Sequence, residues 1–175
     1  MAEVLVLVEH ADGALKKVST ELITAARVLG EPSAVVVGAP GTAAPLTEAL
    51  KAAGAAKIYV AESADAANFL VTPTVDVLEA LVESAAPAAV LAVASTEGKE
   101  VAGRLAARLG AGLLVDVIDG PSGPVGTPVS FASGIKDIDH GPLAQGDQQE
   151  AIGRVFDVTV YGAEGDGIAD DWPAL

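Results

Sequence analysis

The sequence predicts a three-layer α/β fold, in which helices cover both faces of a parallel sheet. Four strand–helix units follow one another over residues 1–117, and each predicted strand is a short, continuous apolar run. Such runs are typical of strands buried on both faces, as they are in parallel sheets covered by helices. We therefore expect a doubly wound, Rossmann-like sheet with strand order 3-2-1-4-5, followed by an irregular C-terminal part.

Strands and helices alternate regularly in the first part of the chain. Ser19 or Thr20 is expected to cap the first helix and Thr42 the second, because hydroxyl side chains accept hydrogen bonds from the free N–H groups of a helix start. Pro73 marks the start of the third helix, and the fourth is expected over residues 98–109. The predicted strands are residues 4–8, 34–37, 58–60, 89–93 and 113–115. The expected core includes Leu5, Val36, Val90, Leu91 and Leu105.

The pattern predicts two parts, an α/β domain over residues 1–119 and a turn-rich, acidic extension over residues 120–175. Residues 120–124, with the sequence GPSGP, indicate a linker between them. One or two added strands are expected in the extension, at residues 129–132 and 155–161. In the second segment, Val155, Asp157 and Thr159 alternate with the apolar residues 156, 158 and 160, as in a strand.

Composition and charge exclude several classes of function. The chain has no cysteine, which excludes disulfides, cysteine nucleophiles and thiolate metal sites. Its net charge is −14, and residues 118–175 carry 10 acidic and only 2 basic side chains. We expect no nucleic acid as a partner, because phosphate binding needs clustered Lys and Arg. No apolar run approaches the roughly 20 residues of a membrane helix and no basic segment opens the sequence, so we expect a cytoplasmic protein without membrane insertion.

Standard catalytic and phosphate-binding signatures are missing from the sequence. Gly98-Lys99 is followed by Glu100 where a P-loop has Ser or Thr, and no G-x-G-x-x-G opens a predicted helix. The sequence contains no G-x-S-x-G motif. An acyl-transfer triad needs a suitably placed histidine, and with two histidines in the chain such triads are nearly excluded. We therefore predict no catalytic residue.

One candidate site lies at the carboxyl ends of the central strands, where open α/β sheets bind ligands. His10 follows the first strand, and Ser95, Thr96, Gly98 and Lys99 follow the fourth. Hydroxyls and free N–H groups at a helix start favour an anion such as a nucleotide phosphate. The alternative is that Ser95 or Thr96 only caps the helix, with Lys99 in solvent and His10 an ordinary loop residue. Three nearby acids oppose an anion and predict weak binding at best: Glu9, Glu97 and Glu100.

Two acidic groups in the extension have competing interpretations. Asp137, Asp139 and His140 carry donors that bind divalent metals, but a solvated acidic loop explains them as well, and we predict no metal site. The acids near the end of the chain either steer a basic partner or form a solvated tail: Glu164, Asp166, Asp170 and Asp171.

Three segments of the first 119 residues resemble a known family when they are taken together. The chain begins with VLVLVEHADGALKKVSTELITAARVLG after its first three residues, continues with KIYVAES, and later contains STEGKEVAGRLAARLGAGLLVDVID. These segments resemble the N-terminal domain of the electron-transfer flavoprotein alpha subunit. The resemblance covers about residues 1–119, roughly two-thirds of the chain.

This resemblance implies a scaffold domain in a heterodimeric electron carrier, rather than an enzyme. Its expected partners are the electron-transfer flavoprotein beta subunit and flavin dehydrogenases. The family holds FAD mainly in a C-terminal domain of the alpha subunit, whose G-G-R-G-like and Q-x-G-Q-T-G-like segments do not occur in these 175 residues. No FAD-binding residue is therefore assigned. The resemblance implies a fold of the adenine nucleotide alpha hydrolase-like type for this chain. AMP is expected only by analogy with the beta subunit, which has a similar fold and a bound AMP.

Two alternatives remain open. In the first alternative, the chain is a stand-alone nucleotide-binding module of the same fold group, which binds its ligand with residues 95–99. In the second, the C-terminal part does not fold natively, because the residues between PVSFASG and RVFDVTVYG fit the family poorly. A truncated subunit, an altered reading frame or a divergent relative would each explain that departure.

Overall fold

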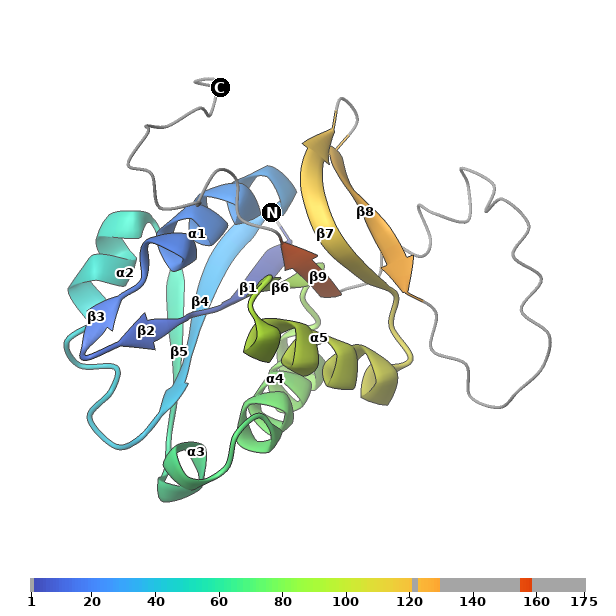
Figure 1. Cartoon of the computed structure of the whole chain (residues 1–175). Coiled ribbons are helices and arrows are strands. Elements are labelled where there is room, and N and C mark those ends of the chain that lie inside the picture. The colour runs from blue at the N-terminus through green and yellow to red at the C-terminus, as the bar shows by residue number, and fades with distance from the viewer. Residues whose placement is uncertain (1, 121–122, 130–154, 159–175) are drawn as a thin grey trace.

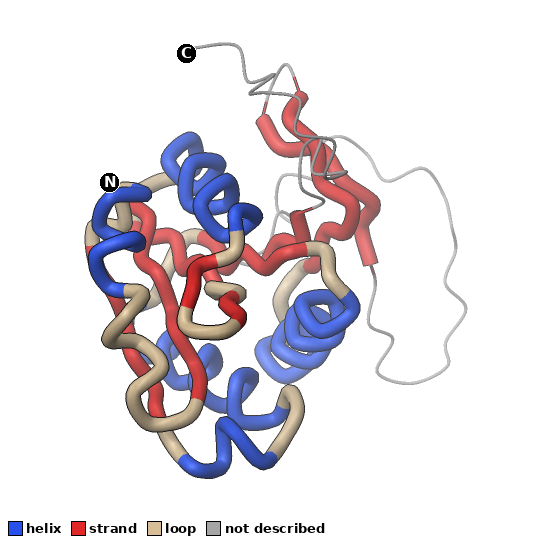
Figure 2. The backbone as a smooth tube through the Cα atoms, turned by 60° about the vertical axis from the view of Figure 1, so that its left-hand side comes forward, coloured by secondary structure: helices blue, strands red, loops and turns tan. Residues whose placement is uncertain are grey.

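The computed structural model describes residues 2–120, 123–129 and 155–158, and it shows helices on both sides of one large sheet (Figures 1 and 2). The strands of this sheet are β1 (Glu3–Leu7), β4 (Glu31–Gly38), β5 (Lys57–Glu62), β6 (Ala89–Val93), β7 (Leu113–Gly120), β8 (Gly123–Val129) and β9 (Val155–Val158). Their order is β5-β4-β1-β6-β9-β7-β8, and every neighbouring pair is parallel except β7 and β8. The predicted three-layer α/β class is confirmed.

The helices divide between the two faces of the sheet. They are α1 (Lys17–Leu29), α2 (Thr47–Ala53), α3 (Ala64–Asn68), α4 (Thr72–Ala85) and α5 (Thr96–Leu109). Buried side chains of α1 and α2 belong to one apolar cluster, and those of α4 and α5 belong to a second. Val4 and Leu5, adjacent on β1, fall into different clusters because side chains alternate across a strand. The expected core residues are all at most 2 % exposed: Leu5, Val36, Val90, Leu91 and Leu105.

The five predicted strands occur in the predicted order 3-2-1-4-5, but one further strand is inserted between the fourth and the fifth. β9 lies between β6 and β7 and runs parallel to both, so β7 is not a neighbour of β6 (Figure 1). An apolar or alternating pattern predicts that a segment is a strand, but it does not predict which backbone that strand will pair with. Residues 159–161 of the strand predicted at 155–161, and residues 130–132 of the one predicted at 129–132, lie outside the described residues.

Of the segment predicted as a linker, residues 120, 123 and 124 belong to two antiparallel strands, and residues 121–122 lie outside the described residues. β7 extends to Gly120, β8 begins at Gly123, and these two glycines are paired in the register. Both β8 and β9 join the sheet formed by the first 119 residues. A division of the chain into 1–119 and 120–175 stays a prediction.

The predicted helix starts are partly correct. α1 begins at Lys17, so Ser19 and Thr20 lie inside the helix and neither caps it. Ser19 is fully buried, and its hydroxyl donates to the carbonyl oxygen of Glu9 and accepts from the N–H of Glu9. This long-range pair outweighs the capping preference of serine. Pro73 stands in the first turn of α4, as predicted.

Thr42 does not cap a helix, because α2 begins only at Thr47. The loop before α2 is held from outside by Glu62, at the end of β5. The carboxylate of Glu62 accepts hydrogen bonds from the N–H groups of Ala43 (2.7 Å) and Gly41 (2.9 Å). These two backbone bonds lower the pKa of Glu62 below its ordinary value.

Two short elements have no counterpart in the sequence prediction. β2 (His10–Ala11) pairs antiparallel with β3 (Ala14–Leu15) just after β1. α3 (Ala64–Asn68) follows β5 and is capped by the Ser63 hydroxyl, which accepts from the N–H of Ala66. Both elements are too short to produce a recognisable period.

A polar cluster joins β1, β4 and β5 at their amino ends. Glu3 accepts hydrogen bonds from the hydroxyls of Ser33 (2.5 Å) and Tyr59 (3.0 Å) and from the ammonium of Lys57 (3.1 Å). Burial alone would raise the pKa of Glu3, but hydrogen bonds from Ser33, Lys57 and Tyr59 hold that pKa below its ordinary value. Ser33 is fully buried, so the carboxylate also provides a buried hydroxyl with its partner.

We predict that Leu91→Ala lowers the free energy of unfolding by about 2–5 kcal/mol, because truncation on a central strand leaves a cavity. Leu91 is 2 % exposed, whereas Val28 on α1 is 57 % exposed. Val28→Ala is therefore the control and is expected to change stability by less than about 0.5 kcal/mol. Urea denaturation measures both, and an unchanged midpoint for Leu91→Ala would contradict the burial of this residue.

We predict that the stabilisation from Glu3 is lost in acid. Its pKa in the folded state lies below the ordinary value of 4.5, so the stabilisation is complete above pH 4.5 and disappears as the pH falls through the folded-state pKa. The denaturation midpoints of the wild type and Glu3→Gln should differ at neutral pH and converge in acid. Tyr59→Phe, which removes one donor and keeps the carboxylate, should cost about 1 kcal/mol at neutral pH. A Glu3→Gln effect that does not change with pH would show that ionisation of Glu3 is unimportant.

Candidate functional site

A hollow of about 570 Å³ lies at the carboxyl ends of β1, β4 and β6. This is the edge at which open α/β sheets bind ligands, next to the point where the connections after the neighbouring strands β1 and β6 go to opposite faces of the sheet. The loops after the three strands form its walls, together with the first turn of α5 and part of α3. Four of the five predicted site residues line it: His10, Ser95, Thr96 and Gly98.

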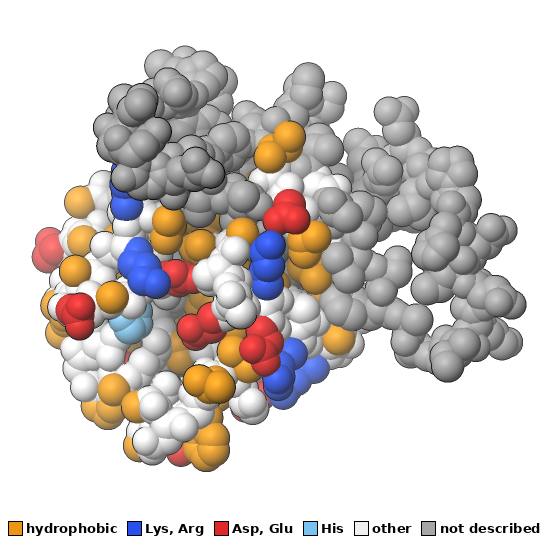
Figure 3. Space-filling view, in the orientation of Figure 1, with side chains coloured by type: hydrophobic (Ala, Val, Ile, Leu, Met, Phe, Trp, Pro, Cys, Tyr) orange, Lys and Arg blue, Asp and Glu red, His pale blue; other side chains and the backbone are white. Residues whose placement is uncertain are grey.

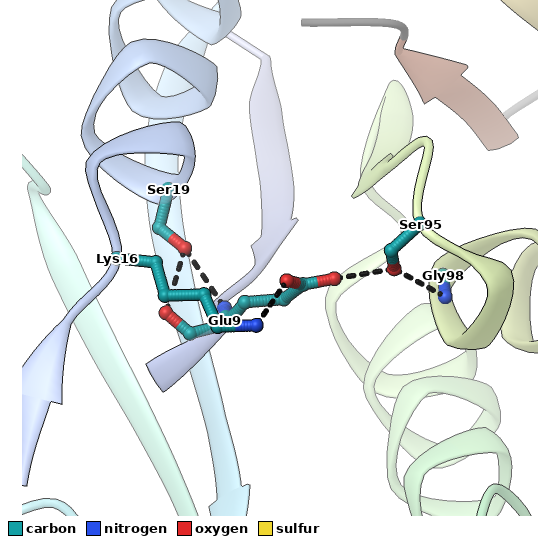
Figure 4. A network of polar contacts seen from close by, with 5 residues as sticks. All are labelled: Glu9, Lys16, Ser19, Ser95 and Gly98. Carbon is teal, nitrogen blue, oxygen red and sulfur yellow. Dashed lines mark hydrogen bonds and ion pairs between the residues drawn. The ribbon is translucent and has the colours of Figure 1, made fainter. Parts of the chain in front are cut away.

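Glu9 is the centre of the polar contacts in this hollow (Figure 4). One oxygen of its carboxylate accepts a hydrogen bond from the Ser95 hydroxyl (2.5 Å), and the other forms an ion pair with Lys16 (2.9 Å). Its backbone N–H and carbonyl oxygen are both bonded to the hydroxyl of Ser19. Glu9 is thereby fixed by α1 on one side and by the start of α5 on the other.

The start of α5 is built by Ser95 and Gly98. Ser95 is the N-cap, and its hydroxyl accepts from the N–H of Gly98 at 3.0 Å, which confirms one of the two predicted caps. A Cβ at Gly98 would overlap the carbonyl oxygen of Val93, the last residue of β6. Glycine is therefore required for the helix to begin this close to the strand.

The remaining predicted site residues have other partners. Lys99 does not line the hollow, and its ammonium lies 3.0 Å from a carboxylate oxygen of Asp116 on β7. His10 does line it, with Nε2 at 3.3 Å from the carbonyl oxygen of Val37. Among the residues that line the hollow, the basic side chain is Lys16, which sequence analysis did not select. The one feature of the sequence that points to Lys16 is its position shortly after the first strand. Lys17 shares that feature, so the sequence does not distinguish the two lysines.

The electrostatics of the hollow do not favour an anion. Glu9 and Glu97 both line it, and Lys16 is already paired with Glu9. The positive end of the α5 dipole meets the carboxylate of Glu9 through Ser95. Over the visible surface, acidic and basic side chains are interspersed and do not form a patch of one sign (Figure 3).

The metal site and the acidic tail considered from the sequence fall outside the described residues. Within residues 2–120, 123–129 and 155–158, no group of three or more His, Asp and Glu side chains is placed to hold a metal ion. Asp137, Asp139, His140 and the acids at 164–171 lie outside these ranges. In the same ranges, no helix combines the length and apolar character needed to cross a bilayer.

The architecture is that of a Rossmann-like α/β domain with a hollow at the carboxyl edge of its sheet, where Glu9 and Ser95 are bonded to each other. The family model for the electron transfer flavoprotein domain matches residues 4–127, and the chain belongs to this family.

Curated relatives give the same family. The chain is 61 % identical over 167 residues to electron transfer flavoprotein subunit alpha of Mycobacterium leprae, a match that covers 95 % of the chain and 52 % of the relative. It is 73 % identical over 131 residues to the same subunit of Mycobacterium tuberculosis H37Rv, covering 75 % of the chain and 41 % of the relative. The chain is 36 % identical over 118 residues to the alpha subunit of Syntrophomonas wolfei, a match that covers 67 % of the chain and 37 % of the relative. The chain thus spans about half the length of these relatives, or less.

We predict opposite effects for two alanine substitutions in α5. Gly98→Ala should destabilise the fold by about 1–3 kcal/mol, because its Cβ would force α5 away from β6. At Gly103, in the same helix, an added Cβ meets nothing within 4 Å. Gly103→Ala should therefore stabilise by about 0.5–1 kcal/mol through helix propensity alone. Urea denaturation compares the two, and equal effects would contradict the close approach of α5 to β6.

Proposed function

We propose that this chain acts as the N-terminal domain of an electron-transfer flavoprotein alpha subunit, as a scaffold in a carrier between flavin dehydrogenases and a downstream acceptor. The observation that carries the proposal is its 73 % identity over 131 residues to an electron transfer flavoprotein alpha subunit. The matched family model covers the first part of the chain and continues into β8. Residues 4–127 therefore form the part to which the scaffold role applies.

The contacts in the hollow support a role without catalysis. Four of its polar groups are bonded in one chain, Lys16–Glu9–Ser95–Gly98. His10 is directed to a backbone carbonyl, so the histidine does not activate a hydroxyl nucleophile here. In the proposed carrier, redox chemistry belongs to FAD, which this proposal assigns to other parts of the assembled protein.

The proposal gives the chain two kinds of partner. The beta subunit is the expected permanent partner, and flavin dehydrogenases are the expected transient ones, in the cytoplasm. The support is indirect, because both follow from the subunit to which the relatives are assigned.

We predict that the isolated chain purifies without stoichiometric FAD and that it forms a complex with the beta subunit. The test co-expresses the chain with the beta subunit, isolates the complex through a tag on one partner, and records the absorbance spectrum after gel filtration. Mycobacterium tuberculosis alpha subunit, which is longer than this chain, is the positive control for both flavin and assembly. A flavin band near equimolar with the chain alone would overturn the cofactor assignment. Separate elution of the two proteins would overturn the scaffold role.

A second candidate function is a stand-alone nucleotide-binding module. The position of the hollow favours it, because it lies at the carboxyl edge of the sheet beside the start of a helix. AMP is the ligand proposed by analogy with the beta subunit. The contacts of Glu9 weigh against a phosphate at this place, and we therefore rank this function second.

A further inference from the structure

We infer that Glu9 determines the specificity of the hollow by excluding phosphate-bearing ligands, because its carboxylate takes the position that a phosphate would need at the start of α5. This inference concerns the hollow alone and does not depend on the proposed scaffold role. It rests on the hydrogen bonds of Ser95, the charges around the hollow, and the rigid placement of Glu9.

The hydroxyl of Ser95 has no hydrogen left to offer a ligand. It donates to the carboxylate of Glu9 and accepts from the N–H of Gly98. A hydroxyl has one proton to donate, and here that proton is directed to an anion of the chain itself. A phosphate oxygen at this position would have to displace the carboxylate from Ser95.

The cation that faces the hollow is also occupied. Of the residues that line it, Lys16 is the only Lys or Arg, and its ammonium is 2.9 Å from the carboxylate of Glu9. Lys99, which sequence analysis selected as the phosphate ligand, pairs with Asp116 instead. A phosphate entering the hollow would therefore meet the negative charges of Glu9 and Glu97 without an unpaired lysine to offset them.

Glu9 is held too firmly to turn away from an entering ligand. Its N–H and carbonyl oxygen are both bonded to Ser19, which is fully buried within α1. The same carbonyl oxygen accepts a second hydrogen bond from the N–H of Lys16 at 3.2 Å. With its backbone bonded to Ser19 and its carboxylate bonded to Ser95 and Lys16, Glu9 keeps its negative charge at the start of α5.

The substitution Glu9→Gln removes the negative charge of the side chain and nearly keeps its shape. Glutamine has nearly the same size, and its amide oxygen can still accept from Ser95. The substitution removes the negative charge and releases the ammonium of Lys16 toward the hollow. It therefore converts the hollow into a site where a helix start and one lysine both favour a phosphate.

The experiment titrates AMP, and separately inorganic phosphate, into the full chain by calorimetry at low ionic strength. Wild type should show no saturable binding up to millimolar ligand. Glu9→Gln should show saturable binding of AMP, with a Kd at least about tenfold below the highest ligand concentration at which wild type shows none. The matched control is Glu97→Gln, which removes the other acid of the hollow but leaves Glu9 bonded to Ser95 and paired with Lys16, so it should gain much less than Glu9→Gln. Adding Lys16→Ala to Glu9→Gln should abolish the gain.

Two results would overturn the inference: micromolar binding of AMP by wild type, or a folded Glu9→Gln that binds no more tightly than Glu97→Gln. Circular dichroism checks that each variant is folded. If Glu9→Gln does not fold, an NMR titration of wild type with AMP decides the question. Unchanged amide signals at residues 9–16 and 95–99 would support exclusion, and saturable shifts there would overturn it.

Discussion

The carboxylate of Glu9 joins two parts of the chain that are 86 positions apart, the loop after β1 and the start of α5. Ser19 fixes the backbone of Glu9 from α1, on the face of the sheet opposite to α5. One residue thus connects both helical layers at the edge of the central strand. The Glu9 carboxylate bonds the hydroxyl that caps α5 and pairs with Lys16, next to the point where Gly98 brings α5 close to β6.

The central strand β1 is anchored by an acid at each of its ends. At the amino end, the carboxylate of Glu3 accepts hydrogen bonds from three side chains of β4 and β5. At the carboxyl end, the carboxylate of Glu9 accepts a hydrogen bond from Ser95 and pairs with Lys16. Glu62 performs a similar task for the loop before α2. Part of the negative charge of this acidic chain is therefore structural, because these carboxylates accept hydrogen bonds from neighbouring strands and loops.

These contacts suit a scaffold within the electron transfer flavoprotein family. Ligand sites in open α/β sheets are expected at the carboxyl edge beside the central strand, and this chain retains a hollow there. Internal contacts already engage the hydroxyl of Ser95 and the ammonium of Lys16, two groups that a nucleotide phosphate would use. In the proposed role, the edge contributes stiffness to the domain, while flavin binding and electron transfer are assigned to the assembled protein.

The sequence by itself determined the local features of this protein. Apolar runs predicted β1, β4 and β6, because burial on both faces demands continuous apolar side chains. The hydroxyls before α5 predicted a cap at Ser95 or Thr96, and Ser95 is the cap. Only the tertiary structure decided which distant groups meet. It placed β9 between β6 and β7, paired Lys99 with Asp116, buried Ser19 against Glu9 and brought Glu9 to Ser95. Local periodicity reports the environment of each segment, whereas these pairings depend on how the segments pack together in three dimensions.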